Sequence, residues 1–247
     1  MKTIAVIPAR FAASRFPGKL MKKIGDRTII RMVYENAVAT GLFNEVIVVT
    51  DSEEIFNEIV GHGGSAKMSI KEHVSGSDRI AEAIAAVDVD VIVNIQGDEP
   101  FVQSEPLADL IDCFTDPSVQ VASLMKKFAD DEDHHNPNMV KVVCNKKMDA
   151  LYFSRSPIPF KRNESSSVPY FRHIGVYAFR KNALIGFTQW PVGELEQTEM
   201  LEQLRYLENG ISIRMVETTT TSIGIDTPED LEKAQLYYRE GCKEAKS

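Results

Sequence analysis

Three basic residues and a glycine directly follow an apolar run near the N-terminus. Residues 4–19 read IAVIPARFAASRFPGK, which places Arg10, Arg15 and Lys19 after the apolar segment. Ligands of open α/β sheets collect at the carboxyl ends of such strands, where backbone N–H groups and positive charge can hold a polyphosphate. The segment matches neither common phosphate loop, because leucine follows its Gly-Lys pair and no G-x-G-x-x-G spacing occurs. The alternative for this segment alone is an exposed basic loop.

Two aspartates elsewhere in the chain have the chemistry of metal ligands. Asp98 lies in NIQGDEP, after a third apolar run, and Asp226 lies in GIDTPEDL, just before the predicted start of the last helix. Mg²⁺ binds one or two protein carboxylates and completes its coordination with water and phosphate oxygens. The alternatives are an ordinary acidic turn at Asp98 and, at Asp226, an acid favoured by the dipole of the helix N-terminus. Thr227 and Asp230 form a cap that does not require Asp226.

A third polar segment, HVSGSDRIAE at 73–82, combines a helix start with an arginine. Ser75 and Asp78 match a capping box, and the free N–H groups of the first turn can bind an anion or a sugar. Because the cap accounts for these two residues, Ser77 and Arg79 are left as candidates for ligand binding.

The polar residues of two later segments are candidates for ligand binding that also have a purely structural interpretation. Arg155 lies among prolines in YFSRSPIPF, and His173 and Tyr177 lie four apart in FRHIGVYAF, on one face of a predicted strand. This face is predicted either to line a sugar site or to be the solvated face of an antiparallel strand. The adjacent His134 and His135 lie in a highly charged loop and are interpreted as solvated.

Buried strands and amphipathic helices must position these groups. Strand-like runs occur at 3–9, 45–50, 90–96, 120–125, 139–144, 171–179 and 211–216. The first three are nearly continuous apolar runs, typical of central parallel strands, and helical patterns at about 27–40 and 75–87 lie between them. This β-α-β-α-β start predicts an α/β fold with a Rossmann-like, mostly parallel sheet. From about residue 120 onward, closely spaced strands and sparser helices predict a smaller antiparallel extension, with a long surface excursion at 156–169.

Length and composition predict one α/β domain over residues 1–247. The net charge of −8 argues against a nucleic acid or an anionic membrane as the main partner. Eight of the 28 Lys and Arg nevertheless fall in residues 1–31, where Asp26 is the only acid, and this asymmetry fits an anionic ligand at one site. No apolar stretch reaches the roughly 20 residues that span a bilayer, no signal-peptide pattern occurs, and three widely spaced cysteines form no C-x-x-C pair. We therefore expect a cytoplasmic protein without membrane insertion.

The motifs taken together resemble those of one enzyme family, the 3-deoxy-manno-octulosonate (Kdo) cytidylyltransferases, also called CMP-Kdo synthetases. The similar segments are, in order, IPARFAASRFPGK, TDSEEI, EHVSGSDRIAE, NIQGDEP, NPNMVKVV, ALYFSRSPIPF, FRHIGVYAF, EMLEQLRYLENG and GIDTPEDL. The resemblance runs from residue 4 to about residue 232. It implies an Mg²⁺-dependent transfer in which CTP and Kdo give CMP-Kdo and pyrophosphate for lipopolysaccharide biosynthesis. The resemblance also implies a homodimer, with an excursion for dimerisation and sugar binding at about 150–180.

The resemblance also implies a role for each matching residue. The catalytic residues would be Lys19, Arg15, Asp98 and Asp226, with the two aspartates as metal ligands. The nucleotide would be held by Pro8, Ala9, Arg10, Ser14, Arg15, Lys19, Ser75 and Gly76. The sugar would be surrounded by Arg79, Gln96, Arg155, His173, Tyr177, Glu202 and Gln203.

Other functions are left open by these residues. The segment between Pro159 and Phe171 is short and serine-rich, near the distal end of the sugar, so that 8-amino-Kdo is an alternative substrate. A sialic-acid cytidylyltransferase would have a similar N-terminal loop but lack the QGDEP and FSRSPIP segments. A non-catalytic nucleotide-binding module would be expected to lose one of the charged catalytic residues, and this chain has all of them. A glycosyltransferase Asp-x-Asp pair occurs at Asp88 and Asp90, but it precedes the third strand, on the wrong side for the site.

Overall fold

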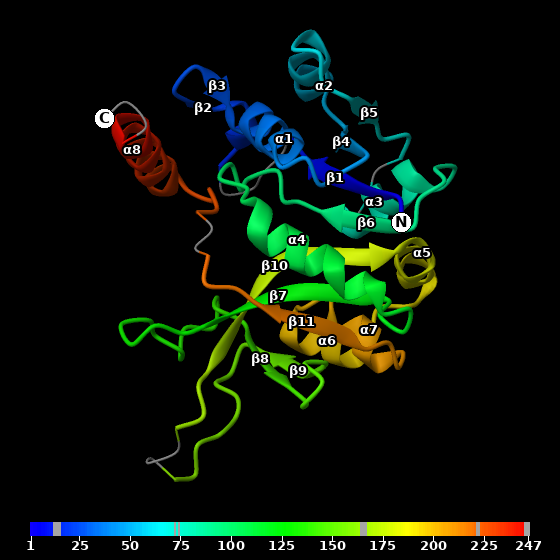
Figure 1. Cartoon of the computed structure of the whole chain (residues 1–247), viewed down its shortest axis with the longest axis vertical. Coiled ribbons are helices and arrows are strands. Elements are labelled where there is room, and N and C mark those ends of the chain that lie inside the picture. The colour runs from blue at the N-terminus through cyan, green and yellow to red at the C-terminus, as the bar shows by residue number, and fades with distance from the viewer. Residues whose placement is uncertain (12–15, 72, 74, 164–166, 221–222, 245–247) are drawn as a thin grey trace. The chain divides into compact units, whose positions relative to one another are not determined.

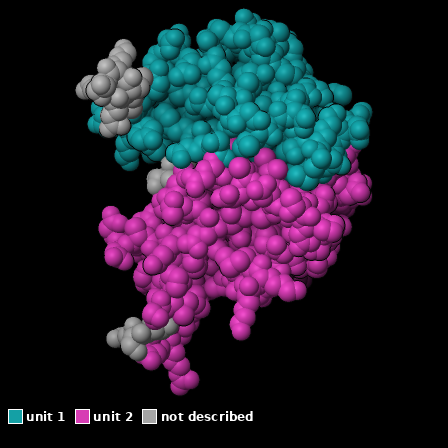
Figure 2. Space-filling view, in the orientation of Figure 1, with its two compact units in different colours: residues 1–104, 221–247 teal, residues 105–220 magenta. Residues whose placement is uncertain are grey.

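The computed structural model describes residues 1–247 except 12–15, 72, 74, 164–166, 221–222 and 245–247. The chain forms two compact units (Figure 2). Unit 1 combines residues 1–104 with residues 221–247, and unit 2 consists of residues 105–220. Unit 1 is therefore discontinuous in sequence, and its last segment is added after unit 2 is complete.

The sheet of unit 1 is parallel (Figure 1). Its strands are β1 (Thr3–Ala9), β4 (Glu45–Thr50), β5 (Ala66–Met68) and β6 (Val91–Asn94), in the order β6-β1-β4-β5. Residue Val6 of β1 is paired with Ile47 of β4 and with Asn94 of β6. The apolar runs at 3–9, 45–50 and 90–96 thus form neighbouring buried strands, as predicted, and the loops that follow β1 and β6 leave the same edge of the sheet.

Three helices connect these strands, namely α1 (Ile29–Ala39), α2 (Glu53–Gly61) and α3 (Gly76–Ile84). Helix α1 begins after Thr28, whose side chain accepts a hydrogen bond from the Arg31 N–H, and it buries an apolar stripe against the sheet. Helices α1 and α3 confirm the predicted patterns at 27–40 and 75–87. Helix α2 and strand β5 were not predicted, although Ser52 caps α2 by accepting a hydrogen bond from the Ile55 N–H.

The remaining elements of unit 1 lie near its N-terminal loop and at its C-terminal end. They are the 3₁₀ turn η1 (Lys19–Met21), the hairpin of β2 (Lys23–Ile24) and β3 (Arg27–Thr28), and helix α8 (Pro228–Glu244). The predicted cap of α8 is present, because the Asp230 N–H donates to Thr227 Oγ1 at 3.3 Å and the Thr227 N–H donates to Asp230 Oδ2 at 3.1 Å.

Unit 2 has mainly antiparallel pairing. Its strands are β7 (Val121–Lys127), β8 (Lys141–Cys144), β9 (Ala150–Ser154), β10 (Phe171–Arg180) and β11 (Ile213–Glu217). Strand β10 runs antiparallel to β7 and β8, β8 runs antiparallel to β9, and β11 runs parallel to β7. These pairings confirm the predicted antiparallel extension, and β9 is an additional strand that the sequence patterns did not indicate.

The expectation that helices become sparse after residue 120 is wrong. Helix α4 (Ser104–Asp112) and the 3₁₀ turn η2 (Cys113–Thr115) precede residue 120. After that residue, α8 is accompanied by three helices that follow β10, namely α5 (Lys181–Gln189), α6 (Glu194–Glu199) and α7 (Leu204–Glu208). These last three have five to nine residues, so that the 3.6-residue apolar period repeats too few times to be recognised. No helix among the described residues is both long and apolar enough to cross a membrane.

Candidate active site

Lys19 lies between two carboxylates at the carboxyl edge of the unit 1 sheet. Its Nζ donates to Asp98 Oδ2 at 2.5 Å and to Asp226 Oδ1 at 2.9 Å. The Lys19 side chain is only 12% exposed. Burial by itself would lower the pKa of Lys19, but the charges and hydrogen bonds of Asp98 and Asp226 outweigh it and raise that pKa above its ordinary value. Lys19 is therefore cationic at neutral pH.

The turn that carries Lys19 is built by Gly18. Gly18 has φ 65° and ψ 18°, a left-handed conformation that glycine adopts without a steric penalty, and it precedes η1. The Gly18 N–H donates to the Phe11 carbonyl at 3.2 Å, which closes the loop, and the buried Leu20 anchors the turn. Ser14 and Arg15, predicted to bind the nucleotide phosphates, lie outside the described residues.

Asp98 is positioned by a close approach of Gly97 to β1. A Cβ atom at Gly97 would lie 3.0 Å from the Pro8 carbonyl oxygen and 3.4 Å from Ile30 Cδ1. The Ile95 N–H donates to the Val6 carbonyl at 3.1 Å, so that the chain follows β1 beyond the end of β6. The absence of a side chain at Gly97 thus allows Asp98 to lie next to the loop that follows β1.

Replacing Gly97 by alanine is expected to lower turnover about tenfold or more, because displacement of a reactive group by as little as 1 Å has large kinetic effects. The added Cβ meets backbone at Pro8, which cannot move without shifting β1. Steady-state assays of Gly97→Ala test this, with Gly61→Ala as the control, since Gly61 lies in α2 and a Cβ there has no atom within 4 Å. Wild-type turnover in Gly97→Ala would contradict this prediction, since it would show that catalysis does not depend on the close approach of Gly97 to Pro8.

Asp226 is positioned by contacts of its two neighbouring segments. The Ile225 N–H donates to the Asp98 carbonyl at 3.0 Å, and the Ile225 side chain is fully buried. The Asp226 N–H donates to Asp230 Oδ2 at 3.2 Å, which ties Asp226 to the cap of α8. Two residues that are distant in sequence, Asp98 and Asp226, are thus joined by a backbone hydrogen bond between their segments.

The two carboxylates have the donor set of a site for a hard divalent cation. Both already pair with one positive group, the Lys19 ammonium. The described residues contain no cluster of three or more His, Cys, Asp or Glu that would hold a metal by itself. Mg²⁺ is satisfied by one or two protein carboxylates together with phosphate oxygens and water. The residues present therefore fit a metal that binds with a polyphosphate.

The start of α3 adjoins the end of β1, as expected for a nucleotide site. A Cβ at Gly76 would lie 3.5 Å from Pro8 Cγ, which is ordinary contact. The Ser75 hydroxyl accepts from the Asp78 N–H at 3.1 Å and donates to the Asp78 carboxylate at 2.9 Å. The hydroxyl of Ser75 is thus engaged in the helix cap, while Arg10, next to the buried Ala9, is exposed.

Arg79 and Gln96 complete the predicted residues of unit 1. Arg79 is 1% exposed and donates to Asp51 Oδ2 at 2.7 Å and to Ser69 Oγ at 2.9 Å. Its Nε has no hydrogen-bond partner among the described residues. Gln96 is half-buried and lies two residues before Asp98. Asp51, which directly follows β4 and pairs with Arg79, was not predicted as a site residue.

Five of the predicted sugar residues lie in unit 2, and three of them, His173, Tyr177 and Glu202, lie near one another. The His173 ring lies 5.3 Å from the Tyr177 ring between centroids, and Ser123 Oγ lies 3.0 Å from His173 Nε2. Burial lowers the pKa of His173 to about 4, and burial together with the Glu202 charge raises the pKa of Tyr177. At neutral pH both rings are uncharged and can exchange hydrogen bonds with hydroxyl groups. Gln203, the residue after Glu202, is 7% exposed, and its Nε2 has no partner in the described part of the chain.

Strand β10 reaches this arrangement through an irregularity rather than through simple alternation. The β10–β7 pairing shifts between Ile174 and Tyr177, where the Ser123 hydroxyl bonds the carbonyl oxygens of Ile174 and Val176. The predicted common face of His173 and Tyr177 is present as packed rings rather than as a solvated face.

Arg155 donates to three backbone carbonyl groups. Its Nε donates to the Glu199 carbonyl at 2.7 Å, and its terminal nitrogens donate to the carbonyls of Pro137 and Met200 at 3.0 and 3.2 Å. The Arg155 carbonyl in turn accepts from the Nζ of Lys141, a fully buried lysine. Lys141 was not predicted, although a lysine within the apolar run MVKVV is itself a signal of a buried polar contact. His134 is not simply solvated, because its ring stacks on Tyr170 at 4.3 Å between centroids.

Comparisons with known proteins identify the chain that carries this site. A family model described as cytidylyltransferase matches residues 4–215. A 3-deoxy-manno-octulosonate cytidylyltransferase of Flavobacterium johnsoniae is 56% identical over 243 residues, which cover 97% of this chain and 100% of that protein. A protein of the same name from Christiangramia forsetii is 54% identical over 237 residues, covering 95% and 96%.

A solved structure has the same fold over almost the whole length. It is CMP:2-keto-3-deoxy-manno-octonic acid synthetase complexed with CTP, with a TM-score of 0.93, 39% identity and coverage of 98% of this chain and 100% of that one. The chain therefore belongs to the cytidylyltransferase family, in the group of the 3-deoxy-manno-octulosonate cytidylyltransferases. The predicted α/β fold class and the resemblance to this family are both confirmed.

Proposed function

We propose that this chain transfers the cytidylyl group of CTP to Kdo, giving CMP-Kdo and pyrophosphate. The observation that carries the proposal is the pairing of Lys19 with Asp98 and Asp226 in a chain that matches a CTP-bound synthetase over its whole length. In the reaction, the anomeric hydroxyl oxygen of the sugar forms a bond to the α-phosphorus. The bond from that phosphorus to the bridging oxygen of the β-phosphate breaks, and the hydroxyl proton is released.

Charge neutralisation is the main task of the protein in this reaction, because phosphoryl transfer leaves little covalent work to the enzyme. Lys19 is cationic and is suited to the negative charge that develops on the departing pyrophosphate, with Arg15 in the same role. Asp98 and Asp226 would hold a Mg²⁺ ion, which when bound supplies charge neutralisation and lowers the pKa of an attacking hydroxyl. The N–H groups at the start of α3, next to Pro8, are suited to nucleotide oxygens.

Neutral hydrogen-bonding groups are suited to the sugar hydroxyls. His173 is uncharged because its pKa is about 4, and the raised pKa of Tyr177 keeps its hydroxyl protonated as a donor. Gln203 Nε2, which has no partner among the described residues, supplies a further donor, with Glu202 next to it in sequence as an acceptor. A site that leaves buried polar groups unpaired until its substrate arrives rejects molecules that lack the matching hydroxyl groups.

The test is pyrophosphate release with CTP and Mg²⁺, comparing Kdo, 8-amino-Kdo and N-acetylneuraminate. Release with Kdo supports the proposal. A preference for 8-amino-Kdo would keep the reaction and change the distal specificity, and release with N-acetylneuraminate alone would contradict the Kdo assignment. Nucleotide binding without turnover of any of the three would favour the non-catalytic module.

Replacing Arg155 by lysine is expected to raise the KM for Kdo about tenfold with little change in the KM for CTP. The planar guanidinium can bind a carboxylate through two parallel hydrogen bonds, whereas an ammonium acts as a point charge. Steady-state kinetics check this, with Arg172→Lys as the control, because Arg172 pairs with Glu132 instead. A lowered melting temperature with an unchanged KM for Kdo would assign Arg155 only to its three carbonyl contacts.

We further propose that the enzyme acts as a cytoplasmic homodimer that supplies an activated sugar for lipopolysaccharide. Large apolar side chains of unit 2 are exposed, among them Phe160 at 87%, Met200 at 76% and Leu151 at 61%. Apolar groups of this size on a surface are typical of protein–protein contacts when they lie together. Light scattering coupled to size-exclusion chromatography distinguishes a dimer from a monomer of 27.6 kDa.

A further inference from the structure

Helix α8 is held to the rest of unit 1 by side chains that contact two particular segments. Gln235 Nε2 donates to the Lys23 carbonyl at 3.1 Å, and Tyr238 packs so closely on Gly25 that a Cβ there would lie 2.7 Å from its ring. Tyr237 makes an edge-to-face contact with Phe101 at 4.7 Å between ring centroids. The first contacts reach the hairpin that follows Lys19, and the last reaches the segment that follows Asp98.

These attachment points lie within a few residues, along the chain, of Lys19 and Asp98. Phe101 comes three residues after Asp98 in NIQGDEPF, and Lys23 comes four residues after Lys19. Asp226 itself is tied to α8 through the hydrogen bond from its N–H to Asp230 Oδ2. A rotation or outward shift of α8 would therefore move Asp226 relative to both Lys19 and Asp98.

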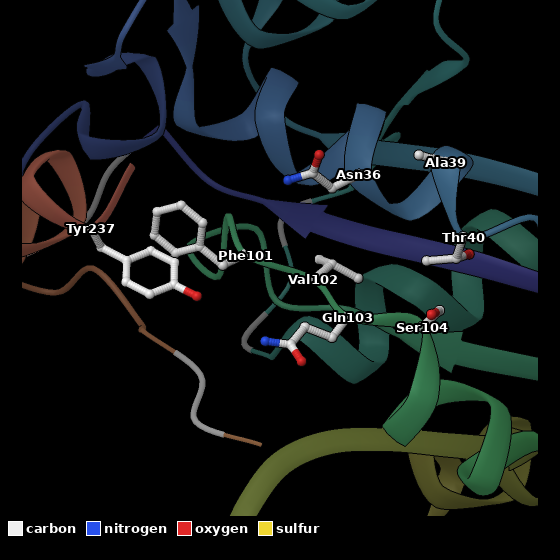
Figure 3. A pocket seen from close by; sticks show the side chains of 8 residues that line it. All are labelled: Asn36, Ala39, Thr40, Phe101, Val102, Gln103, Ser104 and Tyr237. Carbon is white, nitrogen blue, oxygen red and sulfur yellow. The ribbon is translucent and has the colours of Figure 1, made fainter. Parts of the chain in front are cut away.

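The Tyr237–Phe101 contact borders an open pocket rather than a filled core. The pocket has a volume of about 340 Å³ and is lined by Asn36, Ala39, Thr40, Phe101, Val102, Gln103, Ser104 and Tyr237. Figure 3 shows the two rings side by side at one end of the pocket and the α1 residues at the other. Tyr237 is 48% exposed, and its edge-to-face contact with Phe101 is a specific interaction that orients its ring.

We propose that the Tyr237–Phe101 pair is a positioning pair that sets the distance between the carboxylates of Asp98 and Asp226. The inference rests on the proposed metal-dependent cytidylyl transfer and assigns to α8 a part in metal affinity. Tyr237 does not touch the reacting atoms. It acts by holding α8, and therefore Asp226, against the segment that carries Asp98.

The expected result is that Tyr237→Ala weakens metal binding about 3- to 10-fold, the range that corresponds to the loss of an aromatic pair. Because alanine has a higher helix propensity than tyrosine, α8 itself is not weakened by the change. At saturating Mg²⁺ the kcat is expected to stay within about twofold of wild type, since metal binding then restores the position of Asp226.

The experiment measures Mn²⁺ binding in the presence of CTP without sugar, by loss of the free-ion electron paramagnetic resonance signal, with a CTP-only blank subtracted. The Mg²⁺ concentration that gives half-maximal pyrophosphate release is measured on the same variants. Tyr237→Phe keeps the ring and is expected to behave as wild type, and so is Leu236→Ala, which changes a neighbouring side chain that is 56% exposed.

An unchanged Mn²⁺ affinity in Tyr237→Ala would overturn the proposal, and so would an equal loss in Leu236→Ala. A lower kcat with an unchanged Mn²⁺ affinity and an unchanged half-maximal Mg²⁺ concentration would overturn it as well. That result is expected when the substitution only destabilises the protein, because fewer molecules are then active while the metal affinity of the active ones is unchanged. A failure of the proposed cytidylyl transfer can be distinguished from a failure of the Tyr237 proposal. In that case the wild-type chain releases no pyrophosphate from CTP and Kdo, while its Mn²⁺ affinity still reports on Tyr237.

Discussion

Turnover by Asp98→Asn is expected to fall roughly 10²- to 10⁴-fold, the range set by several kcal/mol of lost charge stabilisation in the transition state. Asparagine has nearly the same shape as aspartate, but its neutral amide is a poor ligand for Mg²⁺. The Asp98 side chain is 29% exposed and its carboxylate is bonded by Lys19, so that loss of the charge removes an electrostatic contact without leaving a cavity. Pyrophosphate release at saturating CTP and Kdo measures the effect, and circular dichroism checks the fold.

The same loss is expected for Asp226→Asn, because its carboxylate faces the same ammonium at 2.9 Å. Asp90→Asn is the matched control, since Asp90 lies at the amino end of β6, where its Oδ2 accepts from the Lys2 N–H. Full activity of either site variant at ordinary Mg²⁺ would remove that residue from the metal site. A loss of activity in Asp90→Asn instead would revive the interpretation of Asp88 and Asp90 as a glycosyltransferase motif.

Replacing Lys19 by methionine is expected to lower turnover about 10²- to 10³-fold and, in the opposite direction, to strengthen Mn²⁺ binding in the absence of nucleotide. The first effect follows from the loss of a preorganised cation that stabilises the leaving pyrophosphate. The second follows because the Lys19 ammonium neutralises both carboxylates and must leave them before another cation can be shared between them. Kinetics and electron paramagnetic resonance of Mn²⁺ measure the two effects on one preparation.

Lys22→Met is the control for the Lys19 variant, since Lys22 lies in the same turn and is exposed. Because the pKa of Lys19 is raised, the stabilisation from its ion pairs is fully present below the ordinary lysine pKa and is lost as pH rises through the higher folded-state value. Neutral pH therefore leaves this arrangement intact. Weaker nucleotide-free Mn²⁺ binding in Lys19→Met would contradict the competition between ammonium and metal.

The central parallel strands β1, β4 and β6, helices α1 and α3 and the cap of α8 were predictable because their signals are local. The apolar runs of β1, β4 and β6 are buried on both faces, and the Thr227–Asp230 cap lies within four residues. Helix α2 was missed because only two of its residues, Ile55 and Ile59, are buried apolar residues, which is too few to give a recognisable helical period. The Ser52 cap alone did not indicate a helix. The short helices α5, α6 and α7 were missed because five to nine residues repeat the apolar period too few times.

The composition of the site was predictable, but its geometry was not. The sequence indicated that Lys19, Asp98 and Asp226 are suited to a metal and a polyphosphate. The distances between them depend on the Ile225–Asp98 hydrogen bond and on the close approach of Gly97 to Pro8, which are contacts between segments far apart in sequence. The pairing of Arg79 with Asp51 and the three carbonyl contacts of Arg155 have the same origin, because nothing near either arginine in sequence indicates them.

The discontinuity of unit 1 has a consequence for synthesis of the chain on the ribosome. Residues 1–104 contain the parallel sheet, Lys19 and Asp98, but Asp226 and α8 follow only after the whole of unit 2 has been made. At about 5–20 residues per second, this interval lasts roughly 6 to 23 s. A nascent chain therefore has one carboxylate of the pair and not the other, and the buried positions that later receive Ile225 and Ala234 stay uncovered throughout this period. Chains released early would consequently be both inactive and marked by exposed apolar surface, which are the features that chaperones and proteases recognise.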